Sequence, residues 1–323
     1  MTTSASVTDA LRLLGINATA RLECTSARLR TFRLHLNPGT LARTVRQRVE
    51  DIGITLELSQ PRLYITEGKL LLEIQREDPE FPPFSKVFEP RAGRVLLGVD
   101  TLNNPVQPLL DDLPHLIVAG ATGSGKSVAL HTMVCSLLAS HTPAELRLVL
   151  LDPKCVEFSR YDGLPHLAWP VESDAYKAEN VLKLLTEEMD SRYYRLRDFR
   201  STIFSRVVVF IDEFADLIGQ NAGVGVEIKR LAQKARAVHI HIVLATQRPS
   251  TKVLSGDIKA NFPARLCLRL PSKTDSRVVL DANGAETLLG KGDAIYSNGV
   301  PVRLQVPMVS PETEAKITRF YRG

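Results

Sequence analysis

The chain has 323 residues, of which 44% are apolar, 24% are charged and 6% are aromatic, and its formal net charge is +5. This composition is typical of a globular protein and excludes a largely disordered chain, a collagen-like repeat and a disulfide-rich scaffold. No apolar run approaches the roughly 18 residues of a membrane span, and the polar N-terminus lacks the plan of a signal peptide, so we expect a soluble cytoplasmic protein.

The first 90 residues have the pattern of a small α+β domain. Polar and apolar residues alternate in Arg28-Leu-Arg-Thr-Phe-Arg-Leu-His-Leu36, which is the period of a half-buried strand. The proline-rich segment 77–83 is the expected connector to the second domain, so we place this first domain over residues 1–90. Its expected helices are 7–14 and 40–52, and its expected strands are 28–36, 54–58, 62–66 and 69–75.

From about residue 91 the pattern changes to apolar runs that alternate with helical spacing, which is typical of β-α-β crossovers. We therefore place an α/β domain with a central, mostly parallel sheet over residues 91–323. Its expected strands are 116–119, 146–151, 207–211, 241–245, 265–270, 294–296 and 302–306, and its expected helices are 126–139, 175–199, 226–237 and 312–321.

Residues 120–127 match the phosphate-loop pattern G-x-x-x-x-G-K-[ST] between a predicted strand and a predicted helix. The glycines let backbone N–H groups converge on phosphate oxygens, and the helix adds the positive end of its dipole. Lys126 supplies a charge for the β- and γ-phosphates, and the Ser127 hydroxyl is a ligand for Mg²⁺. The expected nucleotide-binding residues are Gly120, Ala121, Thr122, Gly123, Ser124, Gly125, Lys126, Ser127 and Val128.

Residues 207–213, Val-Val-Val-Phe-Ile-Asp-Glu, predict a buried strand that ends in two carboxylates. We expect Asp212 to complete the Mg²⁺ site and Glu213 to orient and deprotonate the attacking water. The two acids could instead cap the next helix, but their pairing with the phosphate loop favours hydrolysis. Together the motifs predict a nucleoside triphosphatase that uses ATP and Mg²⁺.

His239 and His241 stand two residues apart at the start of a predicted strand, a spacing that metal ions can use. No third ligand is evident nearby in the sequence, so we interpret the pair as residues of a core strand. The four cysteines are far apart and form no C-x-x-C pair, which predicts small buried thiols instead of a zinc or redox centre.

Basic residues are concentrated in two parts of the chain. Residues 200–280 contain 13 lysines and arginines against 6 acidic residues, and the first 50 residues contain eight arginines against three acids. A local surplus of this kind is typical of a polyanion partner, although solvated helix faces also produce it.

The predicted strand 242–245 ends in Thr246-Gln247, the place where a recombinase-like ATPase senses the γ-phosphate. At this point the chain resembles the FtsK/SpoIIIE family of DNA translocases. Nine blocks occur in the family's order within residues 110–296, and Leu36-Asn-Pro-Gly39 resembles part of the family's small α domain. The nine blocks are 113–127, Asp152-Pro-Lys154, Tyr161-Asp-Gly-Leu-Pro-His166, Asp212-Glu-Phe-Ala-Asp216, Leu231-Ala-Gln-Lys-Ala-Arg236, Ala245-Thr-Gln-Arg-Pro-Ser250, Ile258-Lys-Ala-Asn261, Asp275-Ser-Arg277 and Gly292-Asp293.

The resemblance implies a RecA-like P-loop ATPase fold and a hexameric ring that moves double-stranded DNA through its centre in a DNA-stimulated reaction. It implies that Gln247 belongs to the catalytic set and that Arg236 is an arginine finger acting on a neighbouring protomer. It also implies that phosphate-gripping pore loops carry Arg248, Lys259, Lys273 and Arg277, since arginine and lysine suit phosphate contacts.

The chain departs from the family pattern at several places. His239 stands where the family has glycine, Lys291 stands where it has an apolar residue, and no winged-helix domain or membrane-spanning region is evident. We therefore expect a short, motor-only member, with an unidentified loading or effector protein as a further partner. Two alternatives remain open: a protein-secretion motor resembling type VII ATPases, and a DNA packaging or conjugation coupling ATPase.

Overall fold

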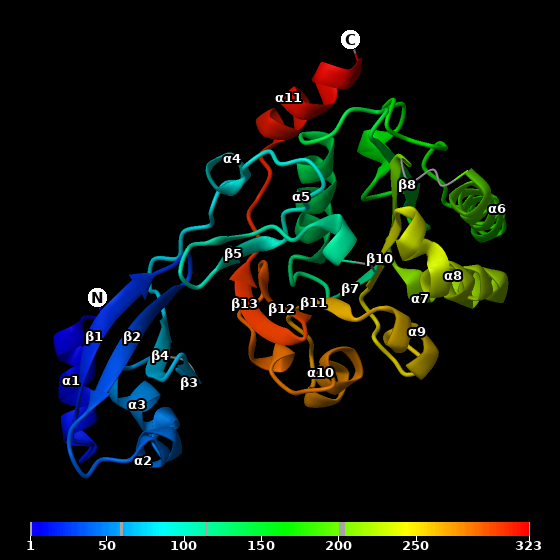
Figure 1. Cartoon of the computed structure of the whole chain (residues 1–323). Coiled ribbons are helices and arrows are strands. Elements are labelled where there is room, and N and C mark those ends of the chain that lie inside the picture. The colour runs from blue at the N-terminus through cyan, green and yellow to red at the C-terminus, as the bar shows by residue number, and fades with distance from the viewer. Residues whose placement is uncertain (1, 59–60, 114, 200–203, 323) are drawn as a thin grey trace. The chain divides into compact units, whose positions relative to one another are not determined.

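The computed structural model describes residues 2–58, 61–113, 115–199 and 204–322 (Figure 1). Its contacts divide the chain into two compact units. The smaller unit comprises Met1–Pro82 and Val99–Asn104, and the larger comprises Pro83–Gly98 and Pro105–Gly323. Within the described residues, every helix is either too short or too polar to cross a lipid bilayer.

The smaller unit is an antiparallel four-stranded sheet in the order β1-β2-β4-β3, packed against short helices. Its core contains Val7, Phe32, Ile52 and Leu72, all of them fully buried. The elements are α1 (Ser4–Leu13), β1 (Ala18–Thr25), β2 (Leu29–Leu36), α2 (Ala42–Gln47), α3 (Val49–Thr55), β3 (Arg62–Thr66) and β4 (Lys69–Gln75).

Two sequence expectations for this unit are wrong. The strand expected at 54–58 does not form, because Ile52 is buried in the core and α3 continues to Thr55 before Glu57 turns the chain with a φ of 55°. The single helix expected at 40–52 is divided at Arg48, where α2 ends and α3 begins. Strand β1 was not expected, since its inward residues include the weakly apolar Ala18 and Ala20.

The larger unit contains most of a nine-stranded sheet in the order β6-β5-β13-β12-β11-β7-β10-β9-β8. The five strands from β11 to β8 are parallel, whereas β12 and β13 are antiparallel. Its strands are β5 (Gly98–Asp100), at which the chain passes between the units, β6 (Pro105–Val106), β7 (His115–Ala119), β8 (Leu146–Leu151), β9 (Arg206–Ile211), β10 (Ile240–Thr246), β11 (Ala264–Leu268), β12 (Asp293–Asn298) and β13 (Val300–Gln305).

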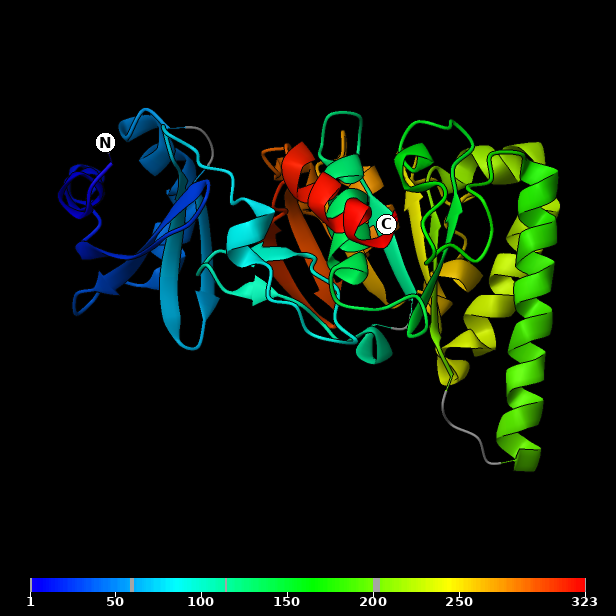
Figure 2. The same cartoon turned by 90° about the horizontal axis from the view of Figure 1, so that it is seen from above.

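Helices cover both faces of these parallel strands. Figures 1 and 2 both place α5 on one side of β8, β9 and β10, and α6 and α8 on the other. The helices are α4 (Phe84–Val87), α5 (Lys126–Leu138), α6 (Ala175–Phe199), α7 (Phe214–Gln220), α8 (Ala222–Lys234), α9 (Gly256–Asn261), α10 (Lys273–Leu280) and α11 (Pro311–Arg322), with the 3-10 turns η1 (Leu110–Asp112), η2 (Ser159–Tyr161), η3 (Ala235–Val238) and η4 (Ala285–Thr287).

Strand β9 is apolar at every position after Arg206, and its packing shows why. Val207 and Val209 pack into the cluster that includes residues of α6 and α8, whereas Val208 and Phe210 pack into the cluster that includes residues of α5. A strand buried on both faces has no polar side, so alternation is lost and a continuous apolar run remains.

The predicted strands of this unit are confirmed within one or two residues, and the helix expected at 175–199 is confirmed as α6. Helix α8 begins earlier than the expected residue 226, because the Asn221 side chain accepts a hydrogen bond from the Gly223 N–H and caps it. Helices α7, α9 and α10 were not expected, since six to eight residues are too short for a helical period to stand out.

The parallel strands determine where the functional residues meet. Because β8, β9, β10 and β7 are adjacent and run in the same direction, their carboxyl ends share one edge of the sheet. Gly120, Asp152, Asp212 and Gln247 each follow one of these strands. In open α/β sheets this edge is the place where ligands bind.

Candidate functional site

The phosphate loop joins the end of β7 to the start of α5. Gly125 precedes α5 with a φ of 103°, a left-handed conformation that side chains rarely tolerate. A Cβ at Gly125 would lie 2.4 Å from the backbone nitrogen of Gly292. The Gly292 N–H donates to the carbonyl oxygen of Ser124 over 2.7 Å. The segment before β12 therefore holds the loop from the side, and glycine is required at the contact.

Lys126 and Asp212 form a buried ion pair at this edge. Lys126 is the first residue of α5, Asp212 follows β9, and the side chain of each is only 3% exposed. The Lys126 Nζ donates to Asp212 Oδ1 across the end of β10, which lies between β7 and β9. The structure thus brings together the phosphate-loop lysine and the first carboxylate of the acidic pair.

Glu213 follows Asp212 and adopts a left-handed backbone, with φ 53° and ψ 63°, which is uncommon for a residue other than glycine. Its buried carboxylate accepts hydrogen bonds from the Thr246 hydroxyl at 2.8 Å and from the Gln247 N–H at 3.1 and 3.2 Å. The side-chain oxygen of Gln247 accepts from the Thr122 hydroxyl at 3.0 Å. A continuous set of hydrogen bonds therefore joins the phosphate loop, the tip of β10 and Glu213.

Glu157 was not singled out in the sequence, yet it contacts Ser127. The Ser127 hydroxyl donates to Glu157 Oε1, and His131 Nε2 lies 3.3 Å from Glu157 Oε2. The hydrogen bond from His131, assisted by the Ser127 hydroxyl and the charge of Lys126, lowers the pKa of Glu157 to about 2 in spite of burial. The Asp152 carboxylate accepts the Glu157 N–H at 2.8 Å and so fixes the loop that carries Glu157.

The oxygen atoms of this cluster fit Mg²⁺. The Ser127 hydroxyl and the Asp212 carboxylate are hard oxygen ligands of the kind that Mg²⁺ prefers, and the ionised Glu157 adds negative charge beside them. Lys126 holds Asp212 through a hydrogen bond that a bound nucleotide and ion would replace, and Glu157 holds the Ser127 hydroxyl.

A cavity of about 350 Å³ opens beside the phosphate loop. Its walls come from the loop and from two segments distant in sequence, around β11 and before β12. The exposed Arg269 and Lys291 are among its lining residues, so the cavity wall carries two basic side chains. The lining residues are Ala121, Thr122, Gly123, Ser124, Arg269, Leu270, Pro271, Leu289, Gly290 and Lys291.

Arg236 lies away from the phosphate loop of its own chain. It is exposed, it belongs to η3, and its guanidinium donates to the backbone oxygen of Asp111 at 3.1 and 3.3 Å. Since η3 precedes β10, Arg236 lies near the amino ends of the parallel strands, whereas Lys126 lies beyond their carboxyl ends. The structure does not bring Arg236 into the cluster formed by the other predicted catalytic residues.

Two of the predicted DNA-contacting residues have partners within the chain. Lys259 forms an ion pair with Asp281, which also accepts from Arg265. The two bases outweigh the opposing effect of burial and hold the pKa of Asp281 below its usual range. Arg277 on α10 is exposed and donates to the side-chain oxygen of Asn283 at 2.8 Å. Lys259 and Arg277 therefore contact the residues that follow α10.

The other two predicted DNA-contacting residues are exposed. Arg248 follows the tip of β10 directly after Gln247, and Lys273 is the first residue of α10. Arg248 is thus one residue from the hydrogen-bond set around Glu213.

The sequence profile of the FtsK/SpoIIIE family matches residues 86–206 and 197–251, which together make up about half of the chain. The chain belongs to the FtsK/SpoIIIE family. Within this family, curated relatives are similar over much of the chain. The DNA translocase FtsK of Pasteurella multocida is 37% identical over 374 residues, and the match covers 99% of this chain and 40% of the relative.

Other relatives in the FtsK/SpoIIIE family differ in how much of their length is matched. The DNA translocase FtsK of Leptospira interrogans serovar Lai is 43% identical over 252 residues, covering 71% of this chain and 26% of the relative. That of Haemophilus influenzae is 36% identical, covering 92% of this chain and 65% of the relative. The chain therefore spans between about a quarter and just under two thirds of these relatives.

Solved structures confirm the predicted P-loop ATPase fold. The pCW3 conjugation coupling protein TcpA, in its monomer form with ATPγS, is 23% identical with a TM-score of 0.69, and the match covers 98% of this chain and 99% of that one. The cytoplasmic domain of the type VII secretion ATPase EccC of Thermomonospora curvata is 24% identical with a TM-score of 0.64, covering 74% and 32%. At these identities the likeness establishes the fold.

Proposed function

We propose that this member of the FtsK/SpoIIIE family is an ATP-driven motor that moves along double-stranded DNA. The observation that carries the proposal is the set of hydrogen bonds at the carboxyl edge of the sheet, where Lys126 contacts Asp212 and Glu213 contacts Gln247. The curated relatives that support DNA as the track are 36–43% identical and are DNA translocases. We place the protein in the cytoplasm, where ATP and duplex DNA are both present.

In the proposed reaction, Lys126 exchanges Asp212 for the β- and γ-phosphate oxygens of ATP. Asp212 and the Ser127 hydroxyl would hold Mg²⁺, which would supply positive charge to neutralise the phosphates. Glu157 accepts the hydrogen of the Ser127 hydroxyl, which leaves the lone pairs of the Ser127 oxygen available to a metal ion. A buried charge without a partner would be costly, and this exchange leaves none.

Glu213 accepts a proton from the attacking water in this proposal. In the present structure its carboxylate is held by Thr246 and Gln247 at the tip of β10. Since Gln247 also contacts Thr122 of the phosphate loop, a nucleotide that moves the loop also moves the contacts of the base. Arg248, the next residue, is exposed and available to DNA. This short path couples hydrolysis to the track.

The ring is the second part of the proposal. Arg236 is exposed and remote from its own phosphate loop, which suits an arginine that completes the site of a neighbouring copy. Arg248, Lys259, Lys273 and Arg277 are proposed to contact DNA phosphates, because a motor must grip every sequence alike. For Lys259 this requires DNA to replace its ion pair with Asp281.

ATP hydrolysis measured with and without long duplex DNA tests the proposal. We expect duplex DNA to stimulate hydrolysis, and the protein to displace a third strand annealed to the duplex in an ATP-dependent manner. Glu213→Gln should retain ATP binding and lose hydrolysis by about 10²- to 10⁴-fold, because an amide cannot accept the proton. Glu312→Gln, which alters an exposed glutamate of α11, is the matched control and should hydrolyse ATP at the parental rate.

Two outcomes would contradict different parts of the proposed function. Hydrolysis by Glu213→Gln at the parental rate would reject Glu213 as the base. Glu213-dependent hydrolysis that duplex DNA leaves unchanged would reject the DNA motor and favour a protein-secretion motor of the same fold.

A further inference from the structure

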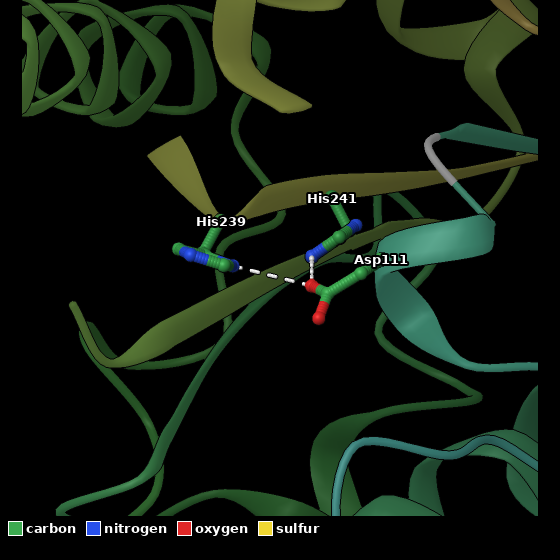
Figure 3. A group of neighbouring side chains, drawn as sticks. All are labelled: Asp111, His239 and His241. Atoms are coloured by element: carbon green, nitrogen blue, oxygen red, sulfur yellow. Dashed lines mark hydrogen bonds and ion pairs between the residues drawn. The ribbon is translucent and has the colours of Figure 1, made fainter. Parts of the chain in front are cut away.

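Three side chains that can bind metal converge at the amino edge of the parallel sheet. Asp111 belongs to η1, His239 ends η3 and His241 lies in β10 (Figure 3). Asp111 Oδ1 lies 3.2 Å from His239 Nδ1 and 3.9 Å from His241 Nε2. All three ligand atoms lie within 4.8 Å of one another, and no other such group occurs among the described residues. The sequence interpretation missed Asp111, because it is distant in the chain.

The backbone at His239 explains how the two imidazoles reach one carboxylate oxygen. His239 has a φ of 59°, a left-handed turn that leads from η3 into β10. Figure 3 shows the rings of His239 and His241 both directed at Asp111. Glycine is the usual residue for such a turn. The backbone conformation alone would therefore favour a residue without a side chain, and His239 places an imidazole there instead.

The surrounding charges prepare the carboxylate as a ligand. Arg206 Nη2 donates to Asp111 Oδ2 at 3.1 Å, which leaves Oδ1 toward the imidazoles. Burial is outweighed by the hydrogen bonds from Arg206 and His239, which hold the pKa of Asp111 below its usual range. Hydrogen bonds to the second oxygen are typical of carboxylates that bind metals. The other neighbours are the guanidinium of Arg236 and the imidazole of His115, whose pKa burial lowers to about 3.

We propose that Asp111, His239 and His241 form a binding site for a divalent transition metal ion of the zinc class. Imidazole nitrogens with one carboxylate suit Zn²⁺, Co²⁺ and Ni²⁺, whereas Ca²⁺ and Mg²⁺ take mainly oxygen ligands. Tetrahedral Zn²⁺ with ligand bonds of about 2.0–2.1 Å separates its ligand atoms by roughly 3.4 Å. The separations of 3.2 and 3.9 Å to Asp111 lie on either side of that value.

The site has an open side and is distinct from the nucleotide site. The side chains of Asp111 and His239 are 45% and 31% exposed, so a fourth position faces solvent, whereas His241 is buried. η1 precedes β7 and His239 precedes β10, so the cluster lies at the amino ends of strands whose carboxyl ends carry the phosphate loop and Gln247. The ion therefore links η1 to β10 and lies apart from the nucleotide site of its own chain.

Titration of the untagged, chelator-treated full chain with ZnCl₂ in an isothermal calorimeter, without nucleotide, tests the site. We expect one Zn²⁺ per chain. His239→Gly should weaken binding by at least about 100-fold, since even residues that only support metal ligands contribute 10- to 100-fold. This variant keeps the fold, because glycine adopts the φ of 59° freely. His35→Ala, which removes an exposed histidine of β2, is the matched control and should bind as the parent does.

Co²⁺ absorption gives a second measurement that depends on geometry. The parent with Co²⁺ should show the intense visible bands of a four-coordinate ion, and His239→Gly should show none. Zn²⁺ binding that survives in His239→Gly, or a parent that binds no Zn²⁺, would overturn the proposal and leave the cluster as hydrogen bonds around Asp111.

Discussion

Two lysine–aspartate pairs of the same chemistry stand in opposite environments in this molecule. Lys126 and Asp212 are each 3% exposed and lie at the end of the parallel strands. Lys259 and Asp281 are 20% and 59% exposed and lie beside α10. If one partner is removed, little water can reach the charge that remains in the Lys126–Asp212 pair. More water can reach the charge that remains in the Lys259–Asp281 pair.

Burial determines how each of the two ion pairs can be used in function. When a buried pair separates, each charge needs a new partner. Nucleotide phosphates can pair with Lys126, and Mg²⁺ can pair with Asp212. An exposed pair contributes about 0–1 kcal/mol, so Lys259 can exchange Asp281 for a DNA phosphate at little cost. The buried pair thus marks a site for one specific ligand. The exposed pair suits a surface that binds DNA reversibly.

Lys126→Met and Lys259→Met break the two pairs in parallel. Lys126→Met should lower the free energy of unfolding by about 3–5 kcal/mol, because Asp212 stays buried without its partner. Lys259→Met should lower it by about 0–1 kcal/mol. Urea unfolding followed by circular dichroism measures both, and ATP hydrolysis should be lost only in Lys126→Met. Equal destabilisation of the two variants would contradict the difference drawn from burial.

Arg236 differs from Lys126 and Lys259, because it is an exposed cation with a proposed catalytic role. Arg236→Ala alone should lose about 10³-fold or more in ATP hydrolysis, which is the worth of arginine fingers in related chemistry. Mixed with Glu213→Gln, it should regain part of the activity, since some interfaces then combine an intact arginine with an intact glutamate. The rate of hydrolysis in mixtures of varied ratio measures this. No recovery in mixtures that demonstrably co-assemble would argue that Arg236 does not act between protomers.

The contribution of Glu157 to the free energy of unfolding should depend on pH. Its pKa of about 2 in the folded chain is below the ordinary value of 4.5, so its contribution to stability is present above about pH 4.5 and is lost as pH falls toward 2. The free energy of unfolding of the parent should therefore decrease more between pH 5 and pH 3 than that of Glu157→Gln. Urea unfolding at these two pH values measures the difference. Parallel decreases would show that the contacts with His131 and Ser127 do not favour the ionised form.

The smallest effect is expected at the exposed basic residues. Lys273→Ala or Arg277→Ala should each reduce the salt dependence of duplex binding by roughly one unit of log K against log salt, because each phosphate contact releases counterions. Fluorescence anisotropy at several salt concentrations, with two unrelated duplexes, measures the slope. Lys316→Ala on α11 is the control and should leave the slope unchanged. A strong preference for one duplex would exclude binding through phosphates alone.

The sequence predicts those features that depend on local pattern. Mainly apolar runs identify β8 and β9, and the loop motif identifies Gly125, Lys126 and Ser127, because these signals are carried by neighbouring residues. The pairing of Glu157 with Ser127 is not local. It depends on how Asp152 folds the loop after β8, and the block beginning at Asp152 was the available signal.

The cluster around Asp111 shows the same limit of local patterns. His239 and His241 are visible as a pair, but the third member comes from η1, which reaches them only because β7 and β10 are adjacent in the sheet. The expected strand at 54–58 is wrong for a related reason. Its apolar residues satisfy a strand pattern locally, and burial of Ile52 in the core favours the helix.

The contact between Gly292 and the phosphate loop has a consequence for synthesis of the protein. Ser124 is made well before Gly292, whose N–H holds the Ser124 carbonyl. Closing such a distant contact is slow compared with forming α5 locally. A growing chain on the ribosome therefore carries the motif of the loop long before it carries the finished loop. Nucleotide binding by the nascent chain should therefore begin only when Gly292 has emerged from the ribosome.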